Sequence, residues 1–309
     1  MNVLVIGGNG FIGSHLVSHL LLHRHRVRVI DIANEKYRKP LPAVDYRIAS
    51  LDDLAQLYEA LLDVDVVFHL ASTSVPSTSN IDTVADINKN LIATLNVLNL
   101  VVKRGIRRFV YFSSGGAVYG PTSTSPIPEE HALEPISSYG IVKAAGERYV
   151  ALYQRKYGIK SLIVRPSNPY GPRQGHYIAQ GVVSTFLRKI WAGEPLTVYG
   201  DGSSKKDYIY IDDFIAMCYN LSVSAECGAF NIGSGEGTTL NSIIEHIRSV
   251  TGTDPRISFS GVPDYDVSNF VLDISKVRRS QPDTPATSME SGIRSVWEWM
   301  NEQRGDTSL

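Results

Sequence analysis

Residues 3–13 read VLVIGGNGFIG, a short apolar run followed by a turn with glycines at positions 7, 10 and 13. The run Val3–Ile6 predicts a buried strand, and Leu16, Leu20 and Leu21 beyond the turn predict a helix. Glycines at this spacing allow a tight turn, close approach of a pyrophosphate to backbone N–H groups, and tight packing of helix on strand. The helix start adds partial positive charge. The stretch therefore predicts a dinucleotide-binding unit.

The second strand is expected at Val27–Ile30 and ends on Asp31. A carboxylate at the tip of this strand hydrogen-bonds the adenosine ribose hydroxyls and repels a 2′-phosphate. Asp31 therefore favours NAD over NADP. The alternative is an aspartate that only caps a helix or sits in a loop.

Strands and helices continue to alternate along the first half of the chain. Strands are expected at 64–70, 109–112 and 161–164, and helices at 51–62, at about 90–103 and from Tyr139 to Gly158. Such alternation with nearly continuous apolar strands indicates a Rossmann-type, doubly wound parallel α/β sheet covered on both faces. Right-handed crossovers then bring the carboxyl ends of the strands to one rim, which includes Gly7, Asp31, Leu70, Ser113 and Arg165.

After Pro166 prolines and glycines punctuate shorter segments. Helices are expected at 178–192, 213–222, 240–251 and 293–300, strands at 196–199, 208–211 and 229–232, and a loop at 282–285. We expect residues 1–165 to form the dinucleotide-binding domain, rejoined by part of 204–235. Residues 166–309 would form a smaller mixed α/β substrate-binding portion.

Tyr139 and Lys143 are four residues apart in an expected helix, so their side chains share a face. An ordinary phenol, with a pKa of about 10, is a poor base at neutral pH, but a nearby ammonium lowers that pKa. Ser137 and Ser138 are typical N-cap residues and Gly158 is a typical helix stop. Tyr139 therefore falls in the first turn of a helix at the rim, where active sites of open α/β sheets gather. We interpret Tyr139 as a general base; the alternative is a chance spacing.

Composition bounds the class of protein. The 309 residues are 43% hydrophobic and 20% charged, with a net charge of −1, which gives no attraction to nucleic acid or membranes. The two cysteines, Cys218 and Cys227, lie in no metal-ligand or redox spacing. No stretch approaches the ~20 apolar residues of a membrane span, and the strand directly after Met1 leaves no room for a signal peptide. We expect a cytoplasmic protein without a metal site.

Further motifs extend this pattern to the end of the chain. They are Gly7-x-x-Gly10-x-x-Gly13, His69-Leu70-Ala71, Asn90 with Thr94, SSGGAVYG at 113–120, Tyr139-x-x-x-Lys143, RPSNPYGP at 165–172, LTVYGDG at 196–202, Asp207-Tyr208, Asp212-Asp213, FNIG at 230–233 and Leu272-Asp273. With these motifs, the chain from residue 2 to about residue 300 resembles the extended short-chain dehydrogenase/reductase family. Within the family it looks like the nucleotide-sugar 4-epimerases of the UDP-galactose (UDP-glucose) 4-epimerase type.

The resemblance implies an isomerase of carbohydrate metabolism. It would interconvert UDP-glucose and UDP-galactose, UDP-GlcNAc and UDP-GalNAc, or both pairs, through a transient 4-keto sugar and tightly bound NAD. Tyr139 would take the proton from the sugar 4-hydroxyl, Ser114 would hydrogen-bond the same oxygen, and Lys143 would hold the nicotinamide ribose and tune Tyr139. The resemblance also implies a homodimer that pairs the helix at 90–103 with the helix after Tyr139.

Two sets of binding residues carry over by resemblance. The cofactor-binding set is Gly7, Gly10, Phe11, Ile12, Gly13, Asp31, Ile32, Ser50, Leu51, Leu70, Ala71, Ser72, Asn90, Tyr139, Lys143 and Pro166. The substrate-binding set is Ser114, Tyr139, Asn168, Val198, Tyr199, Lys206 and Phe270. Asn168 would touch the diphosphate, Val198 and Tyr199 the base, and Phe270 falls near the position that gates the sugar 2-substituent.

The chain departs from the family pattern at two cofactor-side positions. Ser50 stands where the family often has an acidic residue that meets the adenine, with Asp52 and Asp53 just beyond. Gly115 occupies the place that some members fill with the catalytic serine or threonine. We expect Ser114 to supply the catalytic hydroxyl, with Ser113 as the runner-up.

The diphosphate clamp departs as well. Lys206 replaces the usual arginine before Asp207-Tyr208, and Pro263 replaces a second expected arginine. Lysine is a point charge without the bidentate fork of arginine. Either Lys205, Lys206 and Arg173 share the role, or the substrate is not an ordinary UDP-hexose; a lipid-linked diphosphosugar is one such alternative.

Three other functions are weaker matches. A nucleotide-sugar 4,6-dehydratase needs an acid beside the catalytic hydroxyl, and the Gly-Gly-Ala run at 115–117 provides none. A reductase that uses external NADPH is disfavoured by Asp31. A dinucleotide-sensing regulator on the same fold would usually lack the base, whereas Tyr139 and Lys143 are both present.

Overall fold

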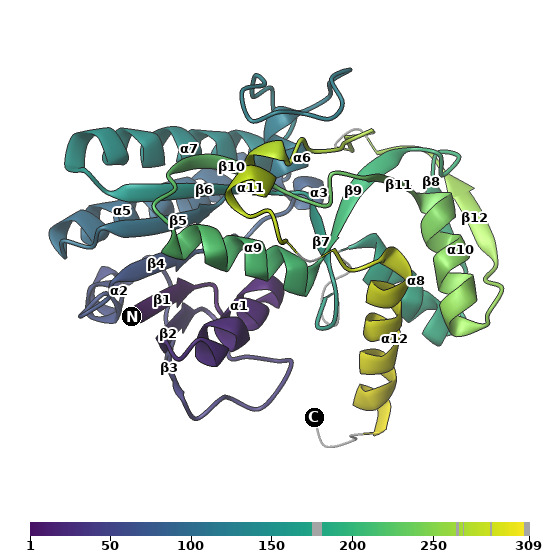
Figure 1. The fold of residues 1–309 in the computed structure, drawn as a ribbon, viewed down its shortest axis with the longest axis horizontal. Coiled ribbons are helices and arrows are strands. Elements are labelled where there is room, and N and C mark those ends of the chain that lie inside the picture. The colour runs from purple at the N-terminus through teal and green to yellow at the C-terminus, as the bar shows by residue number, and fades with distance from the viewer. Residues whose placement is uncertain (175–180, 264–265, 268, 285, 306–309) are drawn as a thin grey trace.

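A seven-stranded sheet in the order β10-β6-β5-β4-β1-β2-β3 forms the centre of the molecule, and every neighbouring pair in it is parallel (Figure 1). The computed structural model describes residues 1–174, 181–263, 266–267, 269–284 and 286–305. The strands of this sheet are β1 (Asn2–Ile6), β2 (Arg26–Asp31), β3 (Val44–Ile48), β4 (Val66–His69), β5 (Arg108–Phe112), β6 (Lys160–Pro166) and β10 (Gly228–Ile232). The expected doubly wound α/β architecture is confirmed.

Helices cover both faces of the sheet (Figure 1). Alternate residues of β1 point to opposite faces: Val3 and Val5 join one apolar core and Leu4 and Ile6 the other. The first core packs under α1 (Phe11–Leu22) and α9 (Ile211–Val223); the second packs under α2 (Leu54–Ala60), α5 (Ala93–Lys103) and α7 (Ser138–Tyr157). Burial on both faces explains the continuous apolar strands.

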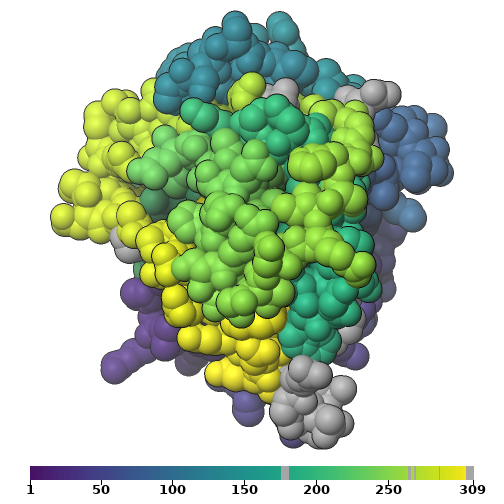
Figure 2. Space-filling model, turned by 90° about the vertical axis from the view of Figure 1, so that its right-hand side faces the viewer, coloured from purple at the N-terminus to yellow at the C-terminus, as the bar shows by residue number. Residues whose placement is uncertain are grey.

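A smaller α/β part lies beyond the carboxyl ends of the strands. Its strands are β7 (Asn168–Tyr170), β9 (Lys205–Tyr210) and β11 (Gly237–Thr239) in one sheet, and β8 (Leu196–Tyr199) and β12 (Ile257–Ser260) in another. Its helices α8 (Val182–Trp191), α10 (Leu240–Thr251) and α12 (Met289–Gly305) enclose a third core. Figure 2 views this end of the molecule, where α12 (yellow) lies beside the green residues of the small sheets and α10.

Five short helical segments complete the fold. They are α3 (Pro76–Ser79), α4 (Thr83–Asp86), the π-helix η1 (Ile87–Ile92), α6 (Gly115–Tyr119) and α11 (Ser275–Ser280). Helices α3, α4 and η1 connect β4 to α5, and they lie against the N-terminal part of α7. They therefore form one side of the rim of the large sheet.

The chain returns from the small part to the large sheet. Strand β10 pairs with β6 in parallel, with Asn231 opposite Arg165, and α9 packs against α1. Both elements come from within or beside the segment 204–235 that was expected to rejoin the first domain. The division into two units at residue 165 stays a prediction.

Some expected boundaries were wrong. The helix expected at 51–62 is shorter because the Asp53 side chain caps it, accepting from Gln56 N at 3.0 Å. The strand expected at 208–211 begins at Lys205, since residues 205–207 pair with β11. The helix expected at 90–103 is preceded by the π-helix η1. The expected start of the helix at 178, and Pro285 in the expected loop, lie outside the described residues.

Candidate active site

A cleft of about 720 Å³ opens along the carboxyl ends of β1, β2, β4 and β5. It spans the point between β1 and β4 where the strand order reverses, which is where open α/β sheets bind ligands. All sixteen residues of the expected cofactor-binding set line it: Gly7, Gly10, Phe11, Ile12, Gly13, Asp31, Ile32, Ser50, Leu51, Leu70, Ala71, Ser72, Asn90, Tyr139, Lys143 and Pro166. The sequence pattern thus brings these residues to one surface.

The glycine turn fits a bound pyrophosphate. Gly7 has a φ of +82°, and a Cβ there would lie 2.8 Å from Ala71 N. A Cβ on Gly13 would lie 2.2 Å from Gly7 O. Gly10 is the N-cap of α1 and, among the described residues, no side chain caps that end. The first N–H groups of α1 therefore face a groove that only glycine leaves open.

Asp31 ends β2 at the edge of the cleft. Its Oδ2 accepts from Asn9 N at 2.9 Å, and its Oδ1 faces Ala33 N at 3.4 Å. Burial raises the pKa of this carboxyl, and the backbone hydrogen bonds from Asn9 and Ala33 oppose that rise. A carboxylate held at this point matches the ribose hydroxyls of a dinucleotide and repels a 2′-phosphate.

Tyr139 and Lys143 line the other end of the cleft. Helix α7 starts after the Ser137 N-cap, whose side chain accepts from Gly140 N at 3.2 Å, and it stops at Gly158 in a left-handed conformation. Both predicted helix signals are confirmed. The Lys143 Nζ lies 5.8 Å from the centre of the Tyr139 ring and donates to Phe112 O at 2.8 Å. The ammonium is thus held by the end of β5.

The acidity of Tyr139 differs from the sequence expectation. Burial raises its pKa to about 12, a hydrogen bond with Ser114 works against that rise, and Asp86 adds to it. Burial also lowers the pKa of Lys143 to about 8, while Asp86 and Glu147 raise it. The expectation that Lys143 sets the phenol pKa was wrong for this structure, because desolvation dominates.

The two candidate serines face different partners. The Ser113 hydroxyl donates to Glu147 Oε1 at 2.5 Å, and Glu147 forms a buried ion pair with Arg165 at 2.6 Å. Ser114 hydrogen-bonds Tyr139. Ser113 lines the cleft, but its hydroxyl is engaged by Glu147, so Ser114 is the hydroxyl that acts on the phenol.

The double glycine after Ser114 has a packing reason. A Cβ on Gly115 would lie 2.7 Å from Pro166 O and 2.9 Å from the Phe270 ring. Phe270 is buried in the same apolar core as the large sheet. Its ring therefore occupies the space next to Gly115, and a serine at position 115 does not fit beside it.

Apart from Tyr139, the expected substrate-binding residues do not line the cofactor cleft. The Asn168 amide donates to Asp207 O at 2.7 Å, Val198 is fully buried in the third core, and Tyr199 is exposed. Lys206 forms an ion pair with Asp266. Of the other expected phosphate ligands, Arg173 donates to Ser14 Oγ at 3.4 Å beside α1. Their roles toward a substrate stay predictions.

Sequence reasoning missed three polar side chains at this site. Asp86 and Asn80 hold the start of α7, and Glu147 holds Ser113 and Arg165. Two of them could have been found from spacing, since Asp86 lies four residues before Asn90 and Glu147 four residues after Lys143. Asn80 has no such signal.

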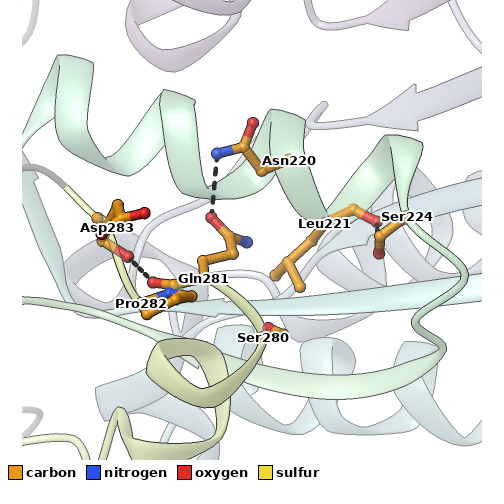
Figure 3. Close-up of a pocket in the computed structure, with 8 residues that line it drawn as sticks. Asn220, Leu221, Ser224, Ser280, Gln281, Pro282 and Asp283 are labelled. Carbon is orange, nitrogen blue, oxygen red and sulfur yellow. Dashed lines mark hydrogen bonds between the residues drawn. The ribbon is translucent and has the colours of Figure 1, made fainter.

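A second, smaller pocket lies away from this rim. It measures about 290 Å³ and is lined by the end of α9 and the turn after α11 (Figure 3). There Asn220 Nδ2 donates to Gln281 Oε1 at 3.2 Å, and the Thr284 hydroxyl donates to Gln281 O at 2.5 Å. Its side chains are engaged with one another and form no catalytic grouping.

Two further features concern metal binding and membranes. The described part of the chain contains no group of three or more His, Cys, Asp or Glu side chains that could hold a metal ion. None of its helices is long and apolar enough to cross a bilayer.

Known proteins are similar to this chain over nearly its whole length. The family model for the NAD dependent epimerase/dehydratase family matches residues 3–233. A UDP-glucose 4-epimerase from Mycolicibacterium smegmatis is 30% identical over 312 residues, covering 98% of this chain and 99% of the relative. A dTDP-4-dehydro-6-deoxyglucose reductase from Escherichia coli is 32% identical over 302 residues, covering 94% of this chain and 95% of the relative.

A solved structure adds a close match in shape. The crystal structure of a UDP-glucose 4-epimerase from Thermotoga maritima with UDP-glucose is 32% identical and superposes with a TM-score of 0.94. The alignment covers 98% of this chain and 100% of that chain. The similarity therefore includes both the large sheet and the smaller part beyond its rim.

Proposed function

The chain belongs to the NAD-dependent epimerase/dehydratase family, and from this premise we propose that it is a nucleotide-sugar 4-epimerase. Its substrates would be UDP-glucose and UDP-galactose, UDP-GlcNAc and UDP-GalNAc, or both pairs. One observation carries the proposal: Tyr139, with its pKa lowered by Ser114 against the rise caused by burial and its ring centre 5.8 Å from the Lys143 Nζ, lines a cleft shaped for a dinucleotide. Whole-length similarity to two UDP-glucose 4-epimerases supports it.

The residues around the phenol would divide the proton chemistry. Tyr139 would accept the proton of the sugar 4-hydroxyl, and Ser114 would hydrogen-bond the same oxygen as its charge develops. Lys143 would donate to a ribose hydroxyl and supply positive charge under the ring. NAD, when bound, supplies the hydride acceptor and a positive charge that favours the phenolate.

Epimerisation then requires the sugar to present both faces. The sugar would lose the O4 proton to Tyr139 and the C4 hydrogen as hydride, giving a 4-keto sugar. While its nucleotide diphosphate stays bound, the sugar would turn over and regain hydride on the opposite face, with the proton returned by Tyr139. The cofactor would be regenerated in place, which explains why it would remain tightly bound.

The proposed roles of the substrate-binding residues are less detailed than those of the residues around Tyr139. We propose that Asn168 and Lys206 lie along the diphosphate path and that Val198 and Tyr199 contact the base through the β8 edge. Lys206 carries a carboxylate partner in Asp266, so it offers less positive charge than a free arginine. A lipid-linked diphosphosugar stays an alternative on this ground.

Two other activities are kept as alternatives. The Escherichia coli relative is a reductase, and a reductase would consume a reduced cofactor at each turnover. A 4,6-dehydratase needs an acid next to the catalytic hydroxyl, whereas Gly115 and Gly116 follow Ser114 here. A regulator that only senses dinucleotides has no use for the Tyr139 grouping.

The test is the product spectrum of the purified protein. Each of the four UDP-sugars is incubated separately, and the matching 4-epimer is the expected product without added cofactor. No epimer from any of the four would overturn the substrate assignment. A reductase would instead act on a 4-keto sugar and would consume one equivalent of reduced nicotinamide for each sugar reduced.

A further inference from the structure

Asp86 is a buried carboxylate beside the proposed catalytic helix. It is the last residue of α4 and is only 4% exposed. Its Oδ1 accepts from Ser74 Oγ at 2.5 Å and from Asn90 Nδ2 at 2.7 Å, and its Oδ2 accepts from Ser138 Oγ at 2.6 Å. One side chain thus joins three separate segments.

Each partner of Asp86 lines the cleft or is next in sequence to a residue that does. Ser138 is the first residue of α7 and directly precedes Tyr139, and its backbone N–H donates to Asn80 Oδ1 at 2.9 Å. Asn90 lines the cleft, and its Oδ1 accepts from Thr73 N at 2.8 Å. Through these bonds Asp86 fixes both the start of the Tyr139 helix and the cleft wall at Thr73.

The backbone around Asp86 is unusual. The helix widens from α4 into the π-helix η1 at Ile87, one residue after Asp86, and Asn90 lies within η1. Single π-helical turns concentrate at functional sites because they re-aim side chains. Here the widened turn presents Asn90 toward both the cleft and Asp86.

The charges around Asp86 belong mainly to α7. The charge of Asp86 acts on Tyr139 and Lys143 of that helix, and Lys89 is exposed on η1. Asp86 raises the pKa of Tyr139 and raises the pKa of Lys143, in each case behind the larger effect of burial. Its charge therefore acts on both members of the pair.

We propose that Asp86 is a positioning residue for the reaction, which sets where Tyr139 stands through Ser138 and Asn90 and balances the buried Lys143 ammonium. This inference rests on the proposed epimerase function. Asp86 touches no substrate or cofactor atom in the proposal; it acts through the groups that do. A carboxylate is needed because an amide would keep the shape but lose the charge.

The test compares pH profiles of Asp86→Asn and wild type. Without the negative charge, Tyr139 gives up its proton more readily and Lys143 holds its proton less well. Both limbs of the kcat profile should move to lower pH, by about half a unit or more, on the order expected when one buried charge that acts on both groups is removed. We expect kcat to fall about tenfold or more with KM nearly unchanged, as for a lost positioning contact.

Two further variants separate charge from folding. Asp86→Glu keeps the charge, so its limbs should stay at the wild-type pH even where kcat falls. Asp82→Asn is the matched control, because Asp82 is an exposed N-cap on the same helix and its amide can keep the bond to Ala85 N. If Asp86→Asn does not fold, Asp86→Ser provides the uncharged side chain. Limbs that stay in place in a folded, uncharged variant overturn the proposal.

A spectroscopic readout keeps this test apart from the function test. Tyrosinate absorbance is titrated in wild type and in Asp86→Asn, and the same curves with Tyr139→Phe are subtracted to isolate Tyr139. We expect the Tyr139 transition at lower pH in Asp86→Asn. This shift can be measured even if no UDP-sugar is a substrate, and its absence contradicts the role of Asp86 while leaving the epimerase proposal standing.

Discussion

At the scale of single residues, the site is governed by burial more than by pairing. Tyr139 and Lys143 are both shifted toward their neutral forms because the protein removes water from them. The i,i+4 spacing correctly placed the two side chains on one face of α7. It could not predict that the Lys143 ammonium donates to Phe112 O, because that contact is with another element. In the proposed mechanism, Ser114 and the positive charge of bound NAD would therefore supply the stabilisation that lets the phenol act as a base.

Tyr139→Phe tests this arrangement directly. Removing one hydroxyl leaves the ring and the cleft wall in place, so NAD binding should be unchanged. Turnover should fall by ~10²–10⁴-fold, the usual contribution of a general base. Steady-state kinetics and cofactor titration of the same preparation measure both. Tyr157→Phe, at the exposed end of α7, is the control. A Tyr139→Phe variant with wild-type turnover removes Tyr139 from the mechanism.

Gly115→Ala tests the packing beside Ser114. The added Cβ would lie 2.7 Å from Pro166 O, a backbone atom that cannot easily move, and 2.9 Å from the Phe270 ring. Overpacking of this kind costs about 1–3 kcal/mol. Urea unfolding should show that loss, and adding Phe270→Leu should recover part of it.

Gly261→Ala is the matched control for Gly115→Ala, because a Cβ at position 261 would meet no atom within 4 Å. It should unfold at nearly the wild-type urea concentration. If Gly115→Ala is as stable as Gly261→Ala, the double glycine has some reason other than the Phe270 ring.

At the scale of elements, the sequence predicted the helices and turns that are set by interactions between residues close together in the chain. The strand–turn–helix at Gly7, the caps at Ser137 and Gly158, and the helix Leu240–Thr251 follow from spacing and capping alone, and the structure has them as expected. Strands β7, β11 and β12 have only three or four residues and exist because β9 and β8 pair with them. The π-helix likewise needs tertiary partners, so a sequence pattern could not reveal it.

The contact between α1 and α9 predicts sensitivity to acid. His19 on α1 and His25 just after it pack around Tyr219 of α9, and burial lowers the pKa of both imidazoles. His69 at the end of β4 is fully buried, and its pKa falls to about 3. Below the unfolded value of about 6.5, the unfolded chain binds more protons than the folded one. The stability that these neutral histidines contribute is therefore full above that pH and is lost as the pH falls.

His19→Gln isolates one of these groups. Its free energy of unfolding, measured by urea titration at pH values from about 7.5 to about 4.5, should fall less steeply with acid than that of wild type. The difference between the two curves cancels groups that titrate equally in both proteins. His246→Gln on α10 is the control for the histidine-to-glutamine substitution itself. A His19→Gln curve parallel to wild type would show that this imidazole is not linked to folding.

At the scale of the whole molecule, the order of the elements decided how much could be foreseen. Alternating strands and helices at 1–165 dictate one parallel sheet, and the rim then follows from the handedness of the crossovers. The substrate side is less predictable, because Val198, Lys206 and Phe270 owe their environments to strands and loops far away in sequence. Lys206 is an example: its partner Asp266 is sixty residues further along the chain.

Exposed apolar side chains on α7 and η1 predict the oligomeric state. Ile141 is 56% exposed and Leu152 42% exposed on one face of α7, and Ile92 at the end of η1 is 43% exposed. Apolar side chains gathered on one face commonly mark an interface, and we propose that a second copy of this chain covers them.

Light scattering after gel filtration should give twice the 34.0 kDa of one chain. Paired substitutions Ile141→Glu and Leu152→Glu should give the monomer, because two buried charges per chain cannot be desolvated without partners. Leu22→Glu, a change of the same kind on α1 at the opposite face of the sheet, should leave the dimer intact. A wild-type protein that elutes and scatters as one chain at all workable concentrations contradicts the pairing, and the exposed face then requires a different partner.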